Sequence, residues 1–214
     1  MNALYPRKKM LPRPTRLLAA DSAGILMTPD EFEAIEFEDV DPRYRYELIN
    51  GVVVVSPPPS DGEANPNGEL EFLLRKYKYE HRQGKCLDAT MTEREVKTRV
   101  GIRRVDRAIW IGYGRPIRSK RDLPSIIVEF VGPGKRAFLR DYEEKRDEYL
   151  ELGAKEYWVI DRFQKTMTVY FQPPAKLAKR VVEESEIYKT PLLPGFKLPL
   201  KRLLDLAVSH EDDE

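Results

Sequence analysis

An uninterrupted apolar segment over Ser125–Val131 constrains the fold of this chain more than any other feature. The segment reads Ser-Ile-Ile-Val-Glu-Phe-Val, so its only charge is Glu129, and polar residues do not alternate with apolar ones. A strand of this kind is buried on both faces, which places it at the centre of a sheet. The chain must therefore supply helices that cover both faces of that sheet.

Turn and helix signals divide the remaining sequence into short elements. Asn50-Gly51 predicts a two-residue hairpin turn between two strands. Apolar stripes with capping residues predict four helices. One is short and begins at Thr28, and the others span Asn65–Gln83, Ala137–Leu152 and Leu200–Val208. Short apolar or alternating runs predict strands at Arg45–Ile49, Val52–Val55, Cys86–Thr90, Arg94–Val100, Ile102–Ile111, Ser125–Val131, Glu156–Ile160, Thr166–Phe171 and Arg180–Tyr188.

This order of elements predicts an α/β chain of the α+β kind. We expect a central mixed sheet flanked by helices, with an added β-hairpin near the N-terminus. A length of 214 residues suits one domain of this type. We expect a basic, poorly ordered arm over residues 1–25, a single domain over residues 26–208 and an acidic tail over residues 209–214.

Composition excludes several kinds of site. Cys86 is the only cysteine, which rules out a disulfide framework and a cysteine-rich zinc site, and it fits a reducing cytoplasm. His81 and His210 are the only histidines, and neither is placed for a catalytic triad. Gly132–Lys135 lacks the spacing of a phosphate-binding loop. No run approaches the roughly 20 apolar residues of a membrane span, so we expect no membrane partner.

Charge is uneven along the chain although its net value is only +1. The segment Arg94–Arg121 contains ten lysines and arginines against two acids, Glu95 and Asp106. Such a segment could follow a phosphate backbone. A solvated strand face explains the same charges, and charge alone favours that simpler explanation.

Two carboxylates stand where apolar residues are expected. Glu129 interrupts the central strand, and burial without a partner would be costly, so it needs a cation or hydrogen bonds. A structural explanation, either a buried salt bridge or a strand end that reaches solvent, accounts for Glu129 as well as a functional site does. Asp106 lies inside the predicted strand Ile102–Ile111, where a surface pair with Arg104 or Arg107 is the favoured explanation for Asp106 alone.

A lysine occupies the apolar face of the second long helix. The face is formed at spacings of four, three, four and three by Phe138, Tyr142, Lys145, Tyr149 and Leu152. Lys145 therefore points toward the sheet. It could extend its amine to solvent, pair with Asp141 one turn earlier, or reach the two carboxylates.

Two acids on neighbouring strands and a lysine on the covering helix form a recognised kind of hydrolytic site. The carboxylates suit Mg²⁺, which prefers oxygen ligands. The metal would lower the pKa of a bound water and stabilise charge on a phosphate. The lysine would orient that water or help to deprotonate it, and no histidine is required.

Several segments are similar to those of a known family. They run from about Met27 to Leu206 and include Arg45–Gly51, Ser56–Pro58, Val105–Ala108, Ile127–Val131, Asp141 with Lys145, Gly153–Asp161, Thr168–Tyr170 and Leu192–Gly195. In these segments the chain resembles the Uma-two family of predicted restriction endonucleases, a branch of the PD-(D/E)XK nuclease superfamily. The resemblance implies a restriction-endonuclease-like fold.

The resemblance also implies roles for individual residues. Asp106 and Glu129 become the metal carboxylates, and Glu47 of the hairpin borders the site. The superfamily's lysine usually stands two residues after the second acid, where this chain has Val131. The family instead supplies the lysine from the next helix, at Lys145.

Other positions depart from the family. Relatives carry a histidine before the helix that follows the hairpin, whereas the stretch Asp61–Asn67 contains Glu63 and no histidine. Relatives also have a proline where Val105 stands. These departures affect the ligand set and the activity more than the fold.

The leading hypothesis is therefore a Mg²⁺-dependent endonuclease, with Mn²⁺ as a possible substitute, acting on nucleic acid and most readily on DNA. Its catalytic residues would be Asp106, Glu129, Lys145 and Glu47, and cutting both strands would favour a homodimer. The alternative is a catalytically silent nucleic-acid-binding or interaction module that retains the nuclease fold.

Overall fold

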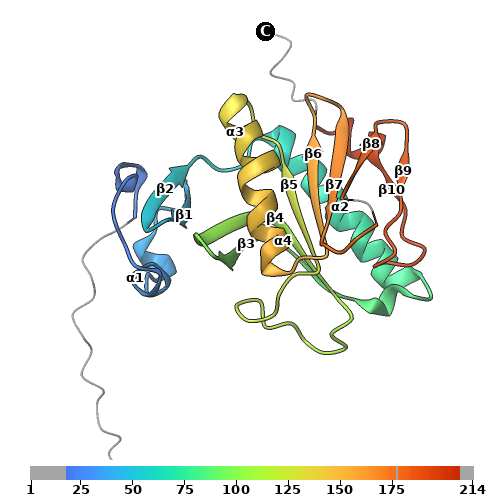
Figure 1. Cartoon of the computed structure of the whole chain (residues 1–214), viewed down its shortest axis with the longest axis horizontal. Helices are drawn as coiled ribbons and strands as arrows, with labels where there is room; N and C mark the ends of the chain where they lie inside the picture. Colours follow the sequence, from blue (N-terminus) through green and yellow to red (C-terminus); the bar gives the residue numbers. More distant parts are fainter. Residues whose placement is uncertain (1–17, 177, 208–214) are drawn as a thin grey trace, which may run out of the picture.

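The computed structural model of the chain describes residues 18–176 and 178–207, which form a mixed β-sheet with helices on both faces (Figure 1). The helices are α1 (Pro29–Glu33), α2 (Asp61–Glu80), α3 (Lys135–Leu139), α4 (Lys145–Leu152) and α5 (Leu200–Leu204). The strands are β1 (Arg45–Ile49), β2 (Val52–Ser56), β3 (Leu87–Thr98), β4 (Gly101–Ile111), β5 (Ile126–Phe130), β6 (Glu156–Asp161), β7 (Thr166–Phe171), β8 (Lys179–Glu183), β9 (Ile187–Tyr188) and β10 (Leu198–Pro199).

The main sheet has the order β2-β1-β4-β5-β6-β7-β8, and β3 also pairs with β4. Strands β5 and β6 are parallel, whereas the other pairs in this sheet are antiparallel. Asn50 and Gly51 both have positive φ between β1 and β2, as the hairpin turn requires. The predicted mixed sheet with flanking helices and an added hairpin is thus confirmed.

The pairing of β4 creates a split in the sheet. Strand β3 pairs with β4 at both Ile102 and Ala108, so it follows one edge of β4. Strand β1 pairs with β4 at Ile102, and β5 pairs with it at Ala108. Since each strand has two edges, β1 and β5 share the other edge and leave residues 103–106 between them.

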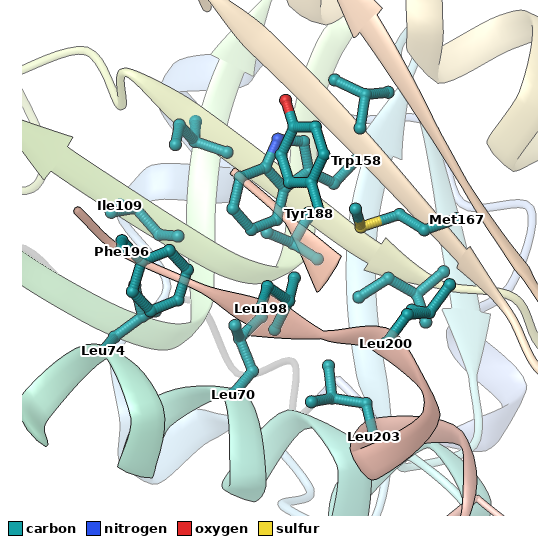
Figure 2. Packing of buried hydrophobic residues seen from close by; sticks show 14 of the residues in the cluster. Leu70, Leu74, Ile109, Trp158, Met167, Tyr188, Phe196, Leu198, Leu200 and Leu203 are labelled. Atoms are coloured by element: carbon teal, nitrogen blue, oxygen red, sulfur yellow. The ribbon is translucent and has the colours of Figure 1, made fainter. Parts of the chain in front are cut away.

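The apolar core lies on both faces of the sheet. On one face, Ile126, Val128 and Phe130 of β5 pack with α2 and α5. Figure 2 shows this face, where leucines of α2 and α5 lie against Trp158 and Met167 of the sheet. On the opposite face, Ile127 and Val131 pack with α4. The alternation along β5 therefore turns Glu129 toward α4.

Helix α2 begins four residues earlier than the sequence pattern predicts. Its N-cap is Ser60, and Glu63 accepts a hydrogen bond from the Ser60 amide at 2.9 Å to complete a capping box. Pro66 lies inside the helix and not at its start. The prediction of a start at Asn65 was wrong because proline was taken to mark the first turn.

The second long helix is interrupted by a π-helical turn. Between α3 and α4, residues Arg140–Glu144 form this turn, and the Lys145 amide donates to the Arg140 carbonyl. The turn places Asp141 at the buried face beside Lys145, while Tyr142 remains half-buried. Gly153, at φ +110°, ends the helix as predicted.

Strand β3 is continuous where two strands were predicted. Glu93 adopts a φ of +53° in its middle, while pairing resumes on both sides at Thr92 and Arg94. One predicted strand ends at Thr90 and the next begins at Arg94, on either side of this residue. The predicted strand Arg180–Tyr188 divides into β8 and β9.

Residues 18–25, the described part of the predicted arm, are packed against the domain. Leu18 is buried and bridges to Val40, and residues 20–22 form a 3-10 turn, so residues 18–25 pack beside the hairpin. The rest of the predicted arm and the tail over residues 209–214 lie outside the described residues. No helix in the described ranges is long and apolar enough to cross a membrane.

Two arginines of the basic segment Arg94–Arg121 are structural. Arg103 is 1% exposed and donates to Glu148 of α4 at 2.9 Å. Arg107 is equally buried and donates to Asn67 of α2 at 2.6 Å. The expectation that the whole segment could follow a phosphate backbone is wrong for these two residues.

The burial of Arg103 can be tested with two glutamates of α4. Each pairs with an arginine of the β3–β4 hairpin, one in a buried and one in an exposed position. Glu148→Gln leaves Arg103 buried without its counter-charge, so we expect the free energy of unfolding to fall by about 3 kcal/mol. Glu151→Gln removes an exposed partner of Arg99, and we expect a loss of about 0.5 kcal/mol or less. Denaturant unfolding measures both, and equal losses would contradict the buried-pair assignment.

Candidate active site

A cavity of about 210 Å³ opens at the split between β1 and β5. Glu47, Asp106, Glu129 and Lys145 all line it, and each is at most 5% exposed. The four residues come from β1, β4, β5 and α4. The structure therefore brings together every residue that the sequence singled out for the site.

Two of the acids hold backbone groups at the split. Oε1 of Glu47 accepts a hydrogen bond from the Arg104 amide at 3.0 Å. Oδ2 of Asp106 accepts one from the Phe130 amide at 2.7 Å, where β5 leaves β4. Because buried amides require acceptors, these carboxylates are part of the fold as well as of the cavity.

Glu129 is held from the α4 side. The Tyr149 hydroxyl donates to its Oε1 at 3.0 Å, and the Lys145 amine lies 3.0 Å from the same oxygen. Burial and the neighbouring Asp106 carboxylate raise the pKa of Glu129, and Lys145 opposes this increase. Burial and Glu129 also raise the pKa of the Tyr149 hydroxyl, which therefore remains a donor.

Lys145 lies between two carboxylates. Its amine is 3.0 Å from Glu129 and 3.3 Å from Asp141, so the pairing with Asp141 and the contact with the sheet acid occur together. Burial disfavours the ammonium, but Glu129 and Asp141 outweigh burial and raise the pKa of Lys145. The two carboxylates therefore favour the ammonium form of Lys145.

Asp141 is a site neighbour that the sequence identified only as a possible partner of Lys145. Its Oδ1 accepts from Arg140 at 3.1 Å, and its backbone carbonyl accepts from Tyr157 at 2.8 Å. Its Oδ2 is buried and has no hydrogen-bond partner in the described part of the chain. Asp141 is thus shared between two cations, Arg140 and Lys145.

Three arginines also line the cavity: Arg45, Arg104 and Arg140. Arg104 belongs to the basic segment that was expected to contact phosphate, whereas sequence reasoning missed Arg45 and Arg140 as site residues. The contact of Arg45 with Asp106 spans 61 positions of the chain and depends on the pairing of β1 with β4. Arg140 reaches the cavity because the π-helical turn begins there. These guanidinium groups make the cavity suitable for an anion such as a phosphodiester.

Asp106 and Glu129 are the candidate ligands for a small divalent cation. Among residues 18–176 and 178–207, no three histidine, cysteine or acidic side chains are arranged to hold a metal. Mg²⁺ needs only one or two protein carboxylates, because water and substrate phosphate complete its coordination. Asp106 and Glu129 share the cavity, and the contacts of Glu129 with Tyr149 and Lys145 use Oε1, which leaves Oε2 free of protein donors in the described residues.

Comparison with known proteins supports the fold. No curated protein matches the sequence significantly. A solved structure, titled as that of "a putative nuclease belonging to DUF820" from Anabaena variabilis, is similar with a TM-score of 0.67 over 85% of this chain and 99% of that chain. The two sequences are 17% identical, so this likeness concerns the fold. The model of the family Uma2, described as "Putative restriction endonuclease", matches residues 29–201, and the chain therefore belongs to the Uma2 family.

Proposed function

We propose that this protein is a metal-dependent nuclease that hydrolyses phosphodiester bonds, with DNA as its main substrate. The observation that carries the proposal is the convergence of Glu47, Asp106, Glu129 and Lys145 on one cavity. Membership in a family described as restriction endonucleases supports the same reaction class.

Each residue has a role that its contacts support. Asp106 and Glu129 would hold Mg²⁺ or Mn²⁺. When bound, the ion supplies a water of lowered pKa and offsets charge on the phosphate. Lys145 fixes Glu129 in position and adds a positive charge next to the reacting phosphate. Tyr149 holds the same carboxylate by a hydrogen bond.

A carboxylate is the better candidate for the proton acceptor, because Glu129 and Asp141 favour the ammonium form of Lys145. Glu47 is our candidate for this role. Its Oε1 is held by the Arg104 amide, while Oε2 receives no donor from the described residues and belongs to a side chain that lines the cavity. A carboxylate held in this manner can accept a proton from the attacking water without moving its backbone.

One observation favours the silent binding module as a second candidate. Both oxygens of Asp106 already accept hydrogen bonds, from Arg45 at 3.1 Å and from the Phe130 amide at 2.7 Å. An acid that is fully engaged could serve the fold alone. Cleavage and metal-binding assays separate the two candidates.

The metal site is tested by calorimetry with Mn²⁺ and Mg²⁺. We expect Asp106→Asn and Glu129→Gln each to weaken Mn²⁺ binding by about tenfold or more, since each removes a charged ligand. The control is Glu156→Gln, which alters a buried carboxylate on β6 that is held by Trp158 and Tyr188 and does not line the cavity. Equal affinity in all variants would exclude the proposed ligands.

Lys145 is tested by cleavage of plasmid and single-stranded DNA. We expect Lys145→Ala to slow cleavage about a hundredfold or more, because it removes a charge next to the reacting phosphate. Lys145→Arg should recover little, since a planar guanidinium does not fit between Glu129 and Asp141. Arg146→Ala is the control, because it removes a charge from the same helix outside the cavity.

Lys145→Ala also leaves two buried acids without their cation, so its melting temperature must be measured and cleavage assayed well below it. Full cleavage by Lys145→Ala would refute the role of this amine. A parent protein that binds DNA but cuts no substrate would favour the binding module.

The arginines of the cavity are tested by DNA binding at several salt concentrations. We expect Arg104→Gln and Arg140→Gln each to weaken binding and to reduce the magnitude of the salt slope by about one unit, as loss of one phosphate contact does. Arg115→Gln is the control, because Arg115 is paired with Asp122 outside the cavity. An identical slope in all these proteins would assign the arginines a structural role only.

A further inference from the structure

Arg45 already contacts one carboxylate oxygen of Asp106, a proposed metal ligand. Its Nη2 lies 3.1 Å from Oδ1 of Asp106, and the same nitrogen donates to Glu93 of β3. The side chain of Arg45 is 17% exposed and that of Asp106 is 7% exposed. A largely buried cation is therefore shared between a cavity acid and an acid of the adjacent strand.

The guanidinium of Arg45 uses little of its hydrogen-bonding capacity. The group has five N–H donors, and the contacts to Asp106 and Glu93 use only Nη2. Its Nε is buried without an acceptor in the described residues. Leaving a buried donor unpaired is costly. Arg103 also has a buried nitrogen without an acceptor, so a role for Arg45 at the site rests on its two acidic partners.

Glu93 reaches Arg45 through an unusual backbone conformation. Its φ is +53°, and the ladder between β3 and β4 continues on both sides of it, with Thr92 opposite Arg107 and Arg94 opposite Val105. Glu93 therefore stands opposite Asp106. A residue other than glycine rarely adopts this conformation, and such residues concentrate at functional sites. Here the conformation supplies a second carboxylate for the same guanidinium.

A divalent cation at Asp106 would compete with Arg45. Both are positive and both require the Asp106 carboxylate, and like charges repel strongly where water is largely excluded. Breaking the contact between the guanidinium and Asp106 costs little free energy only if the guanidinium remains bound to another acid. Glu93 meets this condition, because it binds the same nitrogen.

We propose that Arg45 is the resident cation of the metal site: it neutralises Asp106 in the metal-free protein, and Glu93 retains it when a divalent cation takes Asp106. This inference rests on the proposed metal-binding function. It makes Arg45 and Glu93 positioning residues that set the metal affinity.

Mn²⁺ calorimetry on the full chain tests the inference without measuring activity. We expect Arg45→Gln to bind Mn²⁺ roughly tenfold more tightly than the parent, since a competing charged hydrogen bond is removed. Glu93→Gln should bind Mn²⁺ more weakly. Arg45 then has Asp106 as its only acidic partner and competes more strongly with the ion for that carboxylate. In the Arg45→Gln background, Glu93→Gln should have little further effect, which is the sign that Glu93 acts through Arg45.

Arg104→Gln is the control that measures how far the loss of any positive charge from the cavity changes the affinity for Mn²⁺. Arg104 lines the same cavity and lies 3.4 Å from Glu93, yet it makes no side-chain contact with Asp106. We expect its removal to tighten Mn²⁺ binding much less than Arg45→Gln does. Equal tightening by Arg104→Gln and Arg45→Gln would reduce the effect to bulk electrostatics and overturn the inference.

Two further outcomes separate this inference from the proposed function. If Asp106→Asn abolishes Mn²⁺ binding while Arg45→Gln leaves it unchanged, the metal site stands and the resident-cation inference is overturned. If Mn²⁺ binding does not depend on Asp106, the metal site itself is overturned, and the inference with it. Thermal melts of each variant show whether the change in affinity reflects unfolding.

Discussion

The split along one edge of β4 is the constraint on which the candidate site depends. Strands β1 and β5 pair with separate segments of that edge, and side chains satisfy the backbone between them. Glu47 accepts the Arg104 amide and Asp106 accepts the Phe130 amide. The acids are thus fixed by the same hydrogen bonds that hold the sheet together. A site built on such rigid backbone requires little further ordering when substrate binds.

Buried charge is the second organising feature. Lys145 lies between Glu129 and Asp141, and Arg45 lies between Asp106 and Glu93. Arg140 also pairs with Asp141 and Arg104 with Glu93, so acids and cations are present in equal number along the lining of the cavity. Burying these groups costs free energy that apolar side chains in the same places would not. The arrangement is therefore explained better by chemistry at the cavity than by stability.

The sequence predicts those parts of the fold and site that depend on local periodicity. The central strand and the inward direction of Lys145 follow from spacings within one element. The π-helical turn, the conformation of Glu93 and the burial of Arg103 do not, because each is set by contacts between distant elements. Arg103 shows the limit clearly, since a charged residue in a basic segment resembles a solvated one until Glu148 of α4 is placed beside it.

Lys145 lies on a different element from the lysine of the PD-(D/E)XK pattern. The PD-(D/E)XK pattern expects a lysine two residues after Glu129, and residues two apart on a strand share a face. That position holds Val131, which is buried against the α4 side of the sheet, the side that Glu129 also faces. Lys145 arrives at the same face from the helix that covers it, 3.0 Å from Glu129. A strand position and a helix position on this face can therefore each bring an amine to the same carboxylate, and in this chain the helix position does so.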